Sequence, residues 1–122
     1  MKVFFAIKFD EIQDLLRNGV KTFELSGTDH VISCGKLKKG EQVFLTPVSR
    51  HDIEKGTEGV IAKVENVTMG YWRTASSEFD EKEILTVRLQ VRFVDHGRVE
   101  KVKDLGYGNG LEAEVVRHIV IG

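Results

Sequence analysis

Apolar and polar residues alternate with a period of two along most of the chain, which predicts a protein built mainly from β-strands. The clearest run is 84–94, where every second residue is apolar, as expected for a strand with one face in a core. Residues 58–67 alternate in the same way and are predicted to form a central strand. The other predicted strands are 2–8, 21–25, 31–34, 41–48, 98–102 and 111–121.

One segment near the start departs from this period. In residues 9–18, Phe9, Ile12, Leu15 and Leu16 recur at helical spacing on one face. Gly19 follows and predicts the end of a helix, because glycine readily adopts the left-handed conformation of a C-cap. The whole pattern indicates α+β architecture, mainly β: a small barrel of about six or seven mixed or antiparallel strands with one early helix.

Polar and glycine-rich segments predict the connections. A turn is expected at 26–29, a hairpin turn at 95–97 and a tight connection at 106–110. Residues 69–83 show no regular pattern and are expected to form an excursion loop. The pattern also allows a helical turn at 112–115 ahead of the final strand.

Composition narrows the class of protein. The 122 residues fit a single domain spanning 1–122, and the net charge of -1 argues against binding nucleic acid by bulk electrostatics alone, although a local basic face is allowed. Cys34 is the only cysteine, so no intrachain disulfide can form, and a reducing, cytoplasmic location is the simplest inference. The apolar run 3–7 is too short for a signal peptide or a membrane span, so no membrane association is expected.

The turn Gly19-Val20-Lys21-Thr22-Phe23-Glu24-Leu25, taken with 38–45 and 58–64, resembles the ASCH branch of the PUA-like superfamily. That family carries a glycine, a lysine two residues later and a glutamate three residues further on, and Gly19, Lys21 and Glu24 match this spacing. Leu25 stands where the family often has an arginine, and residues 70–83 have no counterpart. The resemblance covers residues 3 to 68 and implies a PUA-like pseudo-barrel with a cleft beside the helix.

Such domains are mostly RNA-binding modules, so the resemblance implies RNA or a modified nucleotide as the ligand. Lys21 would meet a phosphate or carbonyl and Glu24 a base donor, while an aromatic residue from 70–83 would stack on a base. Arg88 and Arg92 add a polar, partly basic strand face that suits phosphates. The predicted ligand-binding residues are Lys21, Thr22, Glu24, Tyr71, Trp72, Arg73, Arg88 and Arg92.

Two other functions stay open. A subset of the family resembles small amidohydrolases acting on N4-acylated cytidine, and here Lys21 would be the base or activator, assisted by Glu24 or Glu58. Glu24 stands where those enzymes have a threonine, and Thr22 lies on the wrong strand face to replace it. The third function is an accessory or inhibitor protein that grips a protein partner through loop 70–83.

Each candidate also has a purely structural interpretation. The odd spacing of Lys21 and Glu24 puts their side chains on opposite faces of a regular strand, so a shared site requires an irregular turn. The structural alternative is a solvated strand-edge pair contributing under ~1 kcal/mol, with Arg88 and Arg92 on a solvated outer face. Trp72 would cover one end of the barrel. The four histidines lack the spacing of metal ligands, so neither a metal nor a cofactor is expected.

Overall fold

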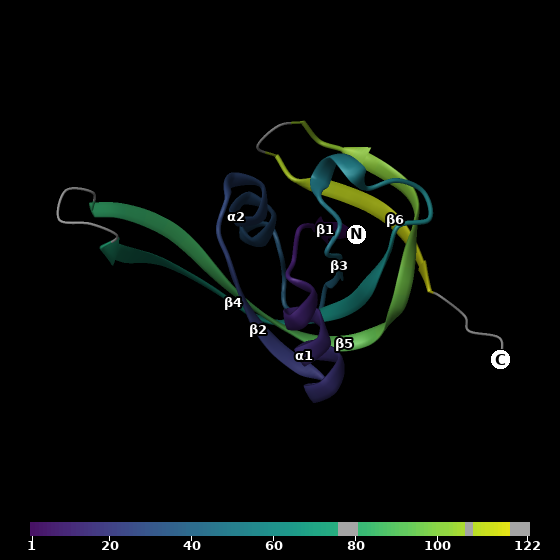
Figure 1. Ribbon diagram of the computed structural model, residues 1–122, viewed down its shortest axis with the longest axis horizontal. Helices are drawn as coiled ribbons and strands as arrows, with labels where there is room; N and C mark the ends of the chain where they lie inside the picture. Colours follow the sequence, from purple (N-terminus) through teal and green to yellow (C-terminus); the bar gives the residue numbers. More distant parts are fainter. Residues whose placement is uncertain (76–80, 107–108, 118–122) are drawn as a thin grey trace.

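The computed structural model describes residues 1–75, 81–106 and 109–117, with side chains described for 1–70, 86–106 and 109–117. Two helices, six strands and one 3-10 turn follow one another along the chain (Figure 1). They are β1 (Lys2–Phe4), α1 (Phe9–Asn18), β2 (Val20–Leu25), α2 (Thr28–Gly35), β3 (Gln42–Leu45), η1 (Arg50–Asp52), β4 (Glu58–Ala75), β5 (Glu81–Asp104) and β6 (Leu111–Arg117). The predicted mainly-β, α+β class is therefore confirmed.

The six strands form one mixed sheet in the order β2-β5-β4-β3-β1-β6. β1 and β3 are parallel, whereas the other neighbours are antiparallel. β5 also pairs with β6, so the hydrogen-bonded pairings run in a closed circuit through β5, β4, β3, β1 and β6. Figure 1 shows β5 curving from the left of the molecule, under the body and up towards β6. This curvature lets one long strand pair with three others.

Two hydrophobic clusters lie on opposite faces of the curved sheet. Successive side chains of a strand point to opposite faces, so Phe4 lies in one cluster and Val3 in the other. The side chains of β3 are divided between the two clusters in the same way. The first cluster includes Ile12 and Leu15 of α1 and Cys34 of α2, so the helices cover that face. The second joins β1, β3, β4, β5 and β6 with Ile53 after η1. Val3 and Phe4 of β1 are therefore both buried, one on each face of the sheet.

The helix predicted at 9–18 is α1, and it ends as predicted. Gly19 has a φ of 77°, and its N–H donates to the Leu15 carbonyl at 2.8 Å. Leu15 and Ile12 are buried, but Phe9 is 65% exposed and Leu16 is 38% exposed. Phe9 and Leu16 instead border a surface groove.

Residues 31–34 are helical, so the strand predicted there is wrong, and α2 begins within the turn predicted at 26–29. The β-branched pair Val31 and Ile32 favours a strand when the segment is taken in isolation. The buried residues are instead His30, Ser33 and Cys34, which share one face at helical spacing. Packing of this face against the core outweighs the local strand preference.

The excursion loop predicted at 69–83 is also wrong over most of its length. β4 continues to Ala75 and β5 begins at Glu81, with pairs running from Gly70–Thr86 to Ala75–Glu81. These paired strands form an arm that projects from the body on the left of Figure 1. Residues 69–83 lack the apolar alternation that predicts strands elsewhere, so this pairing could not be found from the sequence pattern.

A continuous strand replaces the hairpin turn predicted at 95–97. Gly97 lies within β5 and pairs with Gly59 of β4 on one side and Arg117 of β6 on the other. Register shifts after Ile61 and Val99 mark bulges that help the sheet bend. The helical turn allowed at 112–115 is wrong, because these residues belong to β6, and residues 118–121 of the predicted final strand lie outside the described part.

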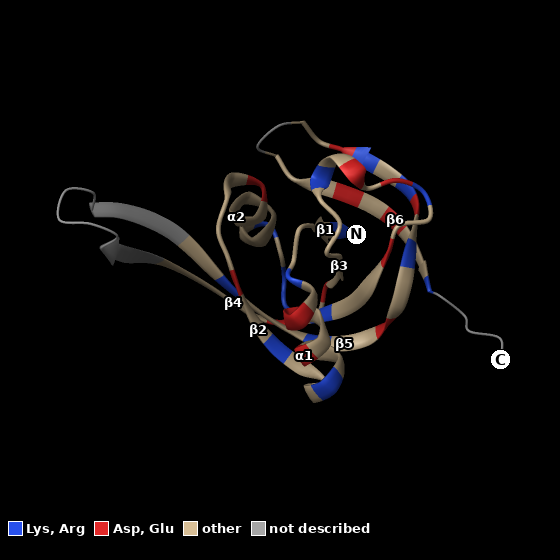
Figure 2. Cartoon of the chain, viewed as in Figure 1, with Lys and Arg blue, Asp and Glu red and all other residues tan. Residues whose placement is uncertain are grey.

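Charged residues of both signs are interspersed over the fold. Figure 2 shows segments of both signs, Lys or Arg and Asp or Glu, along the described parts of β5 and β6. Within the described residues, no helix is long and apolar enough to cross a membrane. The same residues hold no group of three or more His, Cys, Asp and Glu side chains that could bind a metal ion.

His30 is a buried histidine in α2 with an expected pH effect. Its ring lies 4.6 Å from that of Phe5 and 5.6 Å from that of Phe4, and its Nε2 atom has no hydrogen-bond partner among the described residues. Burial lowers its pKa below the ordinary 6.5, which the nearby Asp29 carboxylate partly offsets. The unfolded chain therefore binds a proton at this site more readily than the folded protein does.

Stability contributed by neutral His30 should be present above about pH 6.5 and should be lost as the pH falls below that value. Urea denaturation at pH 7.5 and 5.5 would measure this loss. We expect His30→Gln to show a smaller difference between the two pH values, and the exposed His51→Gln to keep the wild-type difference. An unchanged difference in His30→Gln would refute the role of His30.

Cys34 offers a second probe of the core. Its side chain is buried in the cluster beneath the helices, and burial raises the pKa of its thiol to about 12. Only the thiolate reacts with disulfide reagents, so the native protein should resist labelling at pH 8 and react fully in denaturant. Stoichiometric labelling of the native protein within seconds would contradict this burial.

Candidate functional site

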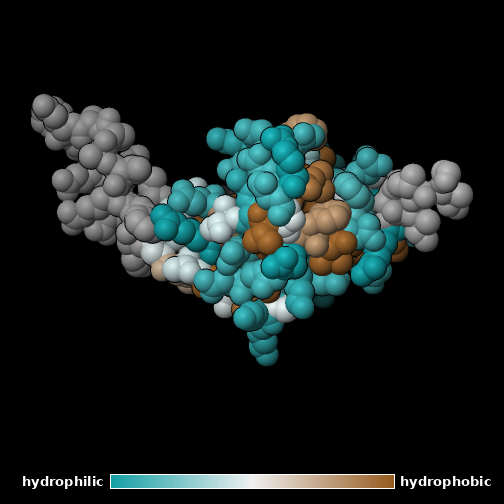
Figure 3. Space-filling model, turned by 90° about the horizontal axis from the view of Figure 1, so that it is seen from below, coloured by the Kyte–Doolittle hydropathy of each residue, from teal (hydrophilic) through white to brown (hydrophobic). Residues whose placement is uncertain are grey.

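A groove of about 370 Å³ lies between α1 and the start of β4. Its lining combines an apolar surface with three polar side chains. The lining residues are Phe9, Ile12, Gln13, Leu16, Pro47, Glu58, Gly59, Val60 and His96. Figure 3, seen from below Figure 1 and so from the side of α1, shows exposed apolar side chains bordered by hydrophilic ones. This size lies within the range of typical small-molecule sites.

The helix supplies one wall of the groove through its periodicity. Phe9, Ile12, Gln13 and Leu16 are spaced at i, i+3, i+4 and i+7, so they form one stripe along α1. Ile12 is buried at the base of this stripe, whereas the large exposed fractions of Phe9 and Leu16 place them at its rim. A ligand in the groove would therefore meet an aromatic ring with most of its surface available.

Strand pairing supplies the opposite wall. Val60 pairs with His96 and Glu58 pairs with Arg98, and directly opposite residues of antiparallel strands point to the same face. Glu58 and His96 line the groove, and Arg98 lies directly opposite Glu58 on the neighbouring strand. Between Glu58 and Val60, Gly59 has no side chain and lets β3 approach closely.

The groove offers complementary chemistry for a planar, polar-edged molecule. The Glu58 carboxylate accepts hydrogen bonds, the Gln13 amide both donates and accepts, and His96 can do either at its two ring nitrogens. An exposed aromatic side chain such as Phe9 can stack on a flat ring. These groups lie at the edge of an apolar floor, an arrangement that orients a ligand without surrounding it with charge.

Of the three candidate catalytic residues, Glu58 is the one that lines this groove within the described structure. Lys21 lies elsewhere: its Nζ is 3.5 Å from the Asp14 carboxylate and 5.8 Å from the centre of the Phe23 ring. Glu24 accepts a hydrogen bond of 3.2 Å from Arg88. The alternation of β2 separates Lys21 from Glu24, as the spacing predicts, so the two side chains do not meet.

Several predicted ligand-binding residues share one exposed face of the sheet. Thr22 pairs with Gln90 and Glu24 pairs with Arg88, so both strands present polar groups to the same side. Arg92 extends this polar sheet face and donates to Glu65 at 2.9 Å. Each arginine is thus paired with a glutamate, and the polar sheet face is balanced in charge.

Tyr71, Trp72 and Arg73 belong to the arm formed by β4 and β5. Their backbones pair with Leu85, Ile84 and Glu83, and their side chains lie outside the described part of the structure. Stacking of these aromatic residues on a base therefore stays a prediction.

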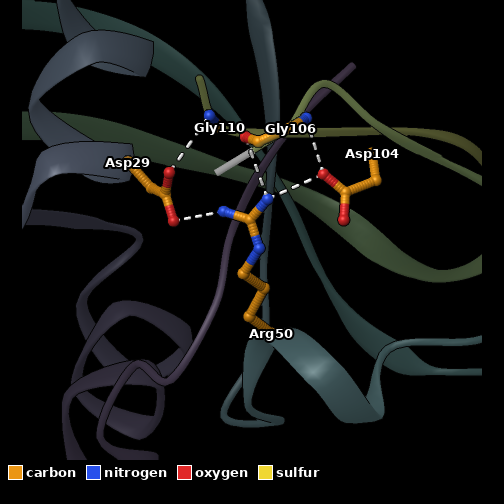
Figure 4. Close-up of polar contacts among 5 residues, drawn as sticks. All are labelled: Asp29, Arg50, Asp104, Gly106 and Gly110. Atoms are coloured by element: carbon orange, nitrogen blue, oxygen red, sulfur yellow. Dashed lines mark hydrogen bonds and ion pairs between the residues drawn. The ribbon is translucent and has the colours of Figure 1, made fainter. Parts of the chain in front are cut away.

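A different polar cluster links distant parts of the chain. The Arg50 guanidinium donates to Asp29 of α2, to Asp104 at 2.7 Å and to the Gly106 carbonyl at 3.2 Å (Figure 4). Its side chain is only 12% exposed, and its guanidinium lies 5.9 Å from the centre of the Phe5 ring. Asp29 also accepts from the backbone N–H of Gly110 at 3.3 Å. We name Asp29, Arg50, Asp104, Gly106 and Gly110 the Arg50 cluster.

Hydrogen bonding perturbs the ionisable groups of the Arg50 cluster. The hydrogen bond to Asp29 raises the pKa of Arg50, and the backbone N–H of Gly106 lowers the pKa of Asp104, with Arg50 adding to that effect. The guanidinium and both carboxylates thus have hydrogen-bond partners within the protein. The cluster is therefore a structural link between α2, η1 and the β5–β6 connection.

A second hollow, of about 540 Å³, lies beside the pairing of β5 with β6. Its charged side chains are Lys101, Lys103, Glu112 and Glu114, so both signs are represented equally. Lys2 donates to Glu112 at 3.3 Å, and this bond lowers the pKa of Glu112. Lys101 and Lys103 lie opposite Glu114 and Glu112 on the paired strand. This hollow is therefore a weaker candidate for a ligand site than the groove beside α1.

Sequence reasoning missed Phe9, Gln13 and His96 as groove residues. The sequence placed Phe9 on the apolar face of the helix without a site role, and it placed His96 in a hairpin turn that does not form. One signal was available: Phe9 and Gln13 share a helical stripe with Ile12 and Leu16, at i, i+3, i+4 and i+7. The pairing of His96 with Val60 depends on bulges and could not be found from local pattern.

The fold and the groove together define a small, mainly-β domain with one ligand-sized apolar groove beside its first helix. The chain belongs to the family described as "Protein of unknown function (DUF473)", whose model matches residues 1–113. It is 32% identical over 107 residues to "Uncharacterized protein MJ0105" from Methanocaldococcus jannaschii, a match covering 86% of this chain and 69% of that protein. No solved structure matches the chain significantly.

Proposed function

We propose that the protein is an RNA- or modified-nucleotide-binding module that holds a base in the groove beside α1. The observation that carries this proposal is the combination of an exposed Phe9 ring with Gln13, Glu58 and His96 around an apolar floor. A nucleobase is flat, stacks on aromatic side chains and presents hydrogen-bonding groups along its edges. The Phe9 ring can stack on the base, and Gln13, Glu58 and His96 can form hydrogen bonds with its edges.

We also propose that the fold is a PUA-like pseudo-barrel of the ASCH branch. The closed circuit of strand pairings and the early helix with a groove beside it support this proposal. The spacing of Gly19, Lys21 and Glu24 supports it from the sequence. The proposed ligand site differs from the one that this motif implies, because the groove is lined by α1 itself and not by the turn that follows it.

The polar sheet face would contribute to binding a longer RNA. Exposed ion pairs such as Arg88–Glu24 stabilise by less than ~1 kcal/mol, so either arginine can exchange its glutamate for a phosphate at little cost. Because few phosphate contacts would form, the affinity for RNA should depend only modestly on salt concentration.

The test compares variants that all lie at exposed positions and so spare the core. Binding of short single-stranded RNA and of nucleotides would be measured by fluorescence anisotropy and by calorimetry. We expect Phe9→Ala to weaken binding about tenfold, since base stacking on an aromatic contributes about 1–3 kcal/mol. Met69→Ala is the matched control, because Met69 is 48% exposed and does not line the groove.

The variant Lys21→Ala tests whether the ligand binds in the groove or at the turn that contains Lys21. Because Lys21 faces Asp14, its truncation should leave affinity within about twofold, a change that is small beside the loss of a stacking contact. If Lys21→Ala abolished binding while Phe9→Ala had no effect, the site would lie at the turn. If wild-type protein bound neither RNA nor any nucleotide, the proposed function would be wrong.

An amidohydrolase acting on an N4-acylated cytidine nucleoside is a second candidate. Glu58 and His96, which both line the groove, could serve as an acid–base pair, whereas Lys21 lies away from them. Incubation with N4-acetylcytidine, followed by chromatography for cytidine, tests this activity. Absence of turnover at enzyme concentrations comparable to the substrate would exclude that substrate.

A protein partner gripped by the β4–β5 arm is a third candidate. The projection of the arm from the body supports it, because a paired β-ribbon with open edges can add a further strand (Figure 1). Deleting residues 70–83 and comparing the elution of complexes by size-exclusion chromatography would separate this function from nucleotide binding.

A further inference from the structure

We infer that the groove beside α1 selects guanine, as a guanine nucleotide or as an unpaired guanosine of RNA, through paired hydrogen bonds to the Glu58 carboxylate. This inference rests on the proposed function and specifies its ligand. It depends on three features of the groove: an acceptor-only group, a cation beside it and an exposed aromatic ring.

The first feature is the acceptor-only chemistry of Glu58. A carboxylate presents two oxygens that accept hydrogen bonds and has no proton to donate. Guanine carries two neighbouring donors, N1–H and the 2-amino group, on its pairing edge. Adenine and cytosine present one donor next to an acceptor on the same edge, and uracil presents one donor between two carbonyls. Two-fold donation to one carboxylate is thus available to guanine alone among the four bases.

The second feature is the position of Arg98. Its register opposite Glu58 puts the two side chains on the same face of neighbouring strands, where opposed Cβ atoms are typically about 5 Å apart. A cationic ligand such as an arginine side chain also donates two parallel hydrogen bonds to a carboxylate, but it would be repelled by Arg98. A guanine ring is neutral, and the phosphate of its nucleotide would be attracted to the same guanidinium.

The third feature is the α1 wall. Phe9, at the rim, offers a ring face on which a purine can stack, and Gln13, one turn further along the helix, offers an amide N–H. With Glu58 holding the amino edge, that amide can donate to the O6 carbonyl of guanine. The amino group of adenine would instead meet the carboxylate with only one donor.

The experiment measures the affinities of GMP, IMP, AMP, CMP and UMP by calorimetry. IMP keeps N1–H and O6 but lacks the 2-amino group, so we expect it to bind about tenfold more weakly than GMP. Glu58→Gln replaces one acceptor with a donor, and this variant should lose the preference for GMP and gain affinity for AMP, because an amide matches the donor–acceptor edge of adenine. The exposed Glu54→Gln is the matched control and should bind GMP as wild type does.

The outcomes distinguish this inference from the function on which it rests. If all five nucleotides bound equally and Phe9→Ala weakened each of them, guanine selection would be wrong while nucleotide binding in the groove would stand. If neither RNA nor any nucleotide bound, both would fail. If N-acetylarginine amide bound in a Glu58-dependent manner and GMP did not, the groove would be an arginine-peptide site and the inference would be overturned.

Discussion

Gly59→Ala is expected to destabilise the protein by about 3 kcal/mol or more, the largest effect of any single methyl group that we predict. A Cβ atom at this position would lie 2.5 Å from Cζ of the Phe44 ring and closer still to the carbonyl oxygen of Leu45. Phe44 and Leu45 are fully buried in β3, which pairs with β4 next to Gly59. The backbone oxygen cannot rotate away as a side chain can, so the sheet itself must shift.

Thermal denaturation would measure this effect, with a Tm expected to fall by roughly 10 °C or more. Gly97→Ala should cost less, because its added Cβ would meet side-chain ends of Ile61 and Val115, each at 2.9 Å. Gly35→Ala is the control: its Cβ would meet only the flexible end of the exposed Met69 at 3.2 Å, at the last residue of α2. A Gly59→Ala protein as stable as Gly35→Ala would mean that the close approach of β3 is absent in solution.

Arg50→Ala is expected to destabilise the fold by about 2–3 kcal/mol. The substitution removes the hydrogen bond between the guanidinium and the largely buried Asp29 carboxylate, and hydrogen bonds to charged groups are each worth about 1.5–3 kcal/mol. It also removes the donor that joins η1 to Asp104 and Gly106 (Figure 4). Hydrogen exchange should show the loss first in α2 and at the β5–β6 connection, because the Arg50 cluster links these elements.

Arg50→Lys tests whether geometry or charge matters in the Arg50 cluster. One ammonium group cannot reproduce the planar fork that reaches Asp29 and Asp104 together, so this variant should recover less than half of the lost stability. Arg92→Ala is the matched control, since its ion pair with Glu65 is exposed and should contribute less than ~1 kcal/mol. Equal stabilities for Arg50→Ala and Arg92→Ala would show that the Arg50 cluster is not a structural link.

Local pattern was sufficient where burial of one face decided the structure. The β5 segment from Val87 to Val91 alternates because one face packs in a core, and its fully buried valines and leucine agree with the prediction. The end of α1 at Gly19 depends on a backbone conformation that glycine favours, which is a local property. Glu58 could be proposed from the sequence because the family resemblance drew attention to an acid on a later strand, and it lies in the groove.

Local pattern failed where contacts between distant segments decided the structure. Val31 and Ile32 favour a strand by themselves, yet helical packing of His30 and Cys34 against the core determines α2. Asp95-His96-Gly97 has the composition of a turn, but β4 pairs with all three residues and β6 pairs with Gly97, which keeps the segment extended. At 69–83 the sequence shows no apolar alternation, and the strands are recognised only from the pairing of β4 with β5.

The sequence by itself determined the mainly-β class, the helix that ends at Gly19 and the separation of Lys21 from Glu24, because each follows from the period of a single segment. Only the tertiary structure decided that Phe9 and Gln13 of α1 face Glu58 and His96 across a groove. The bulged register of β4 with β5 places His96 at that groove. Packing of Ile12 into the core fixes α1 beside the groove. The strand register and the position of α1 both depend on contacts between residues far apart in the chain, and the local pattern of neighbouring residues does not predict such contacts.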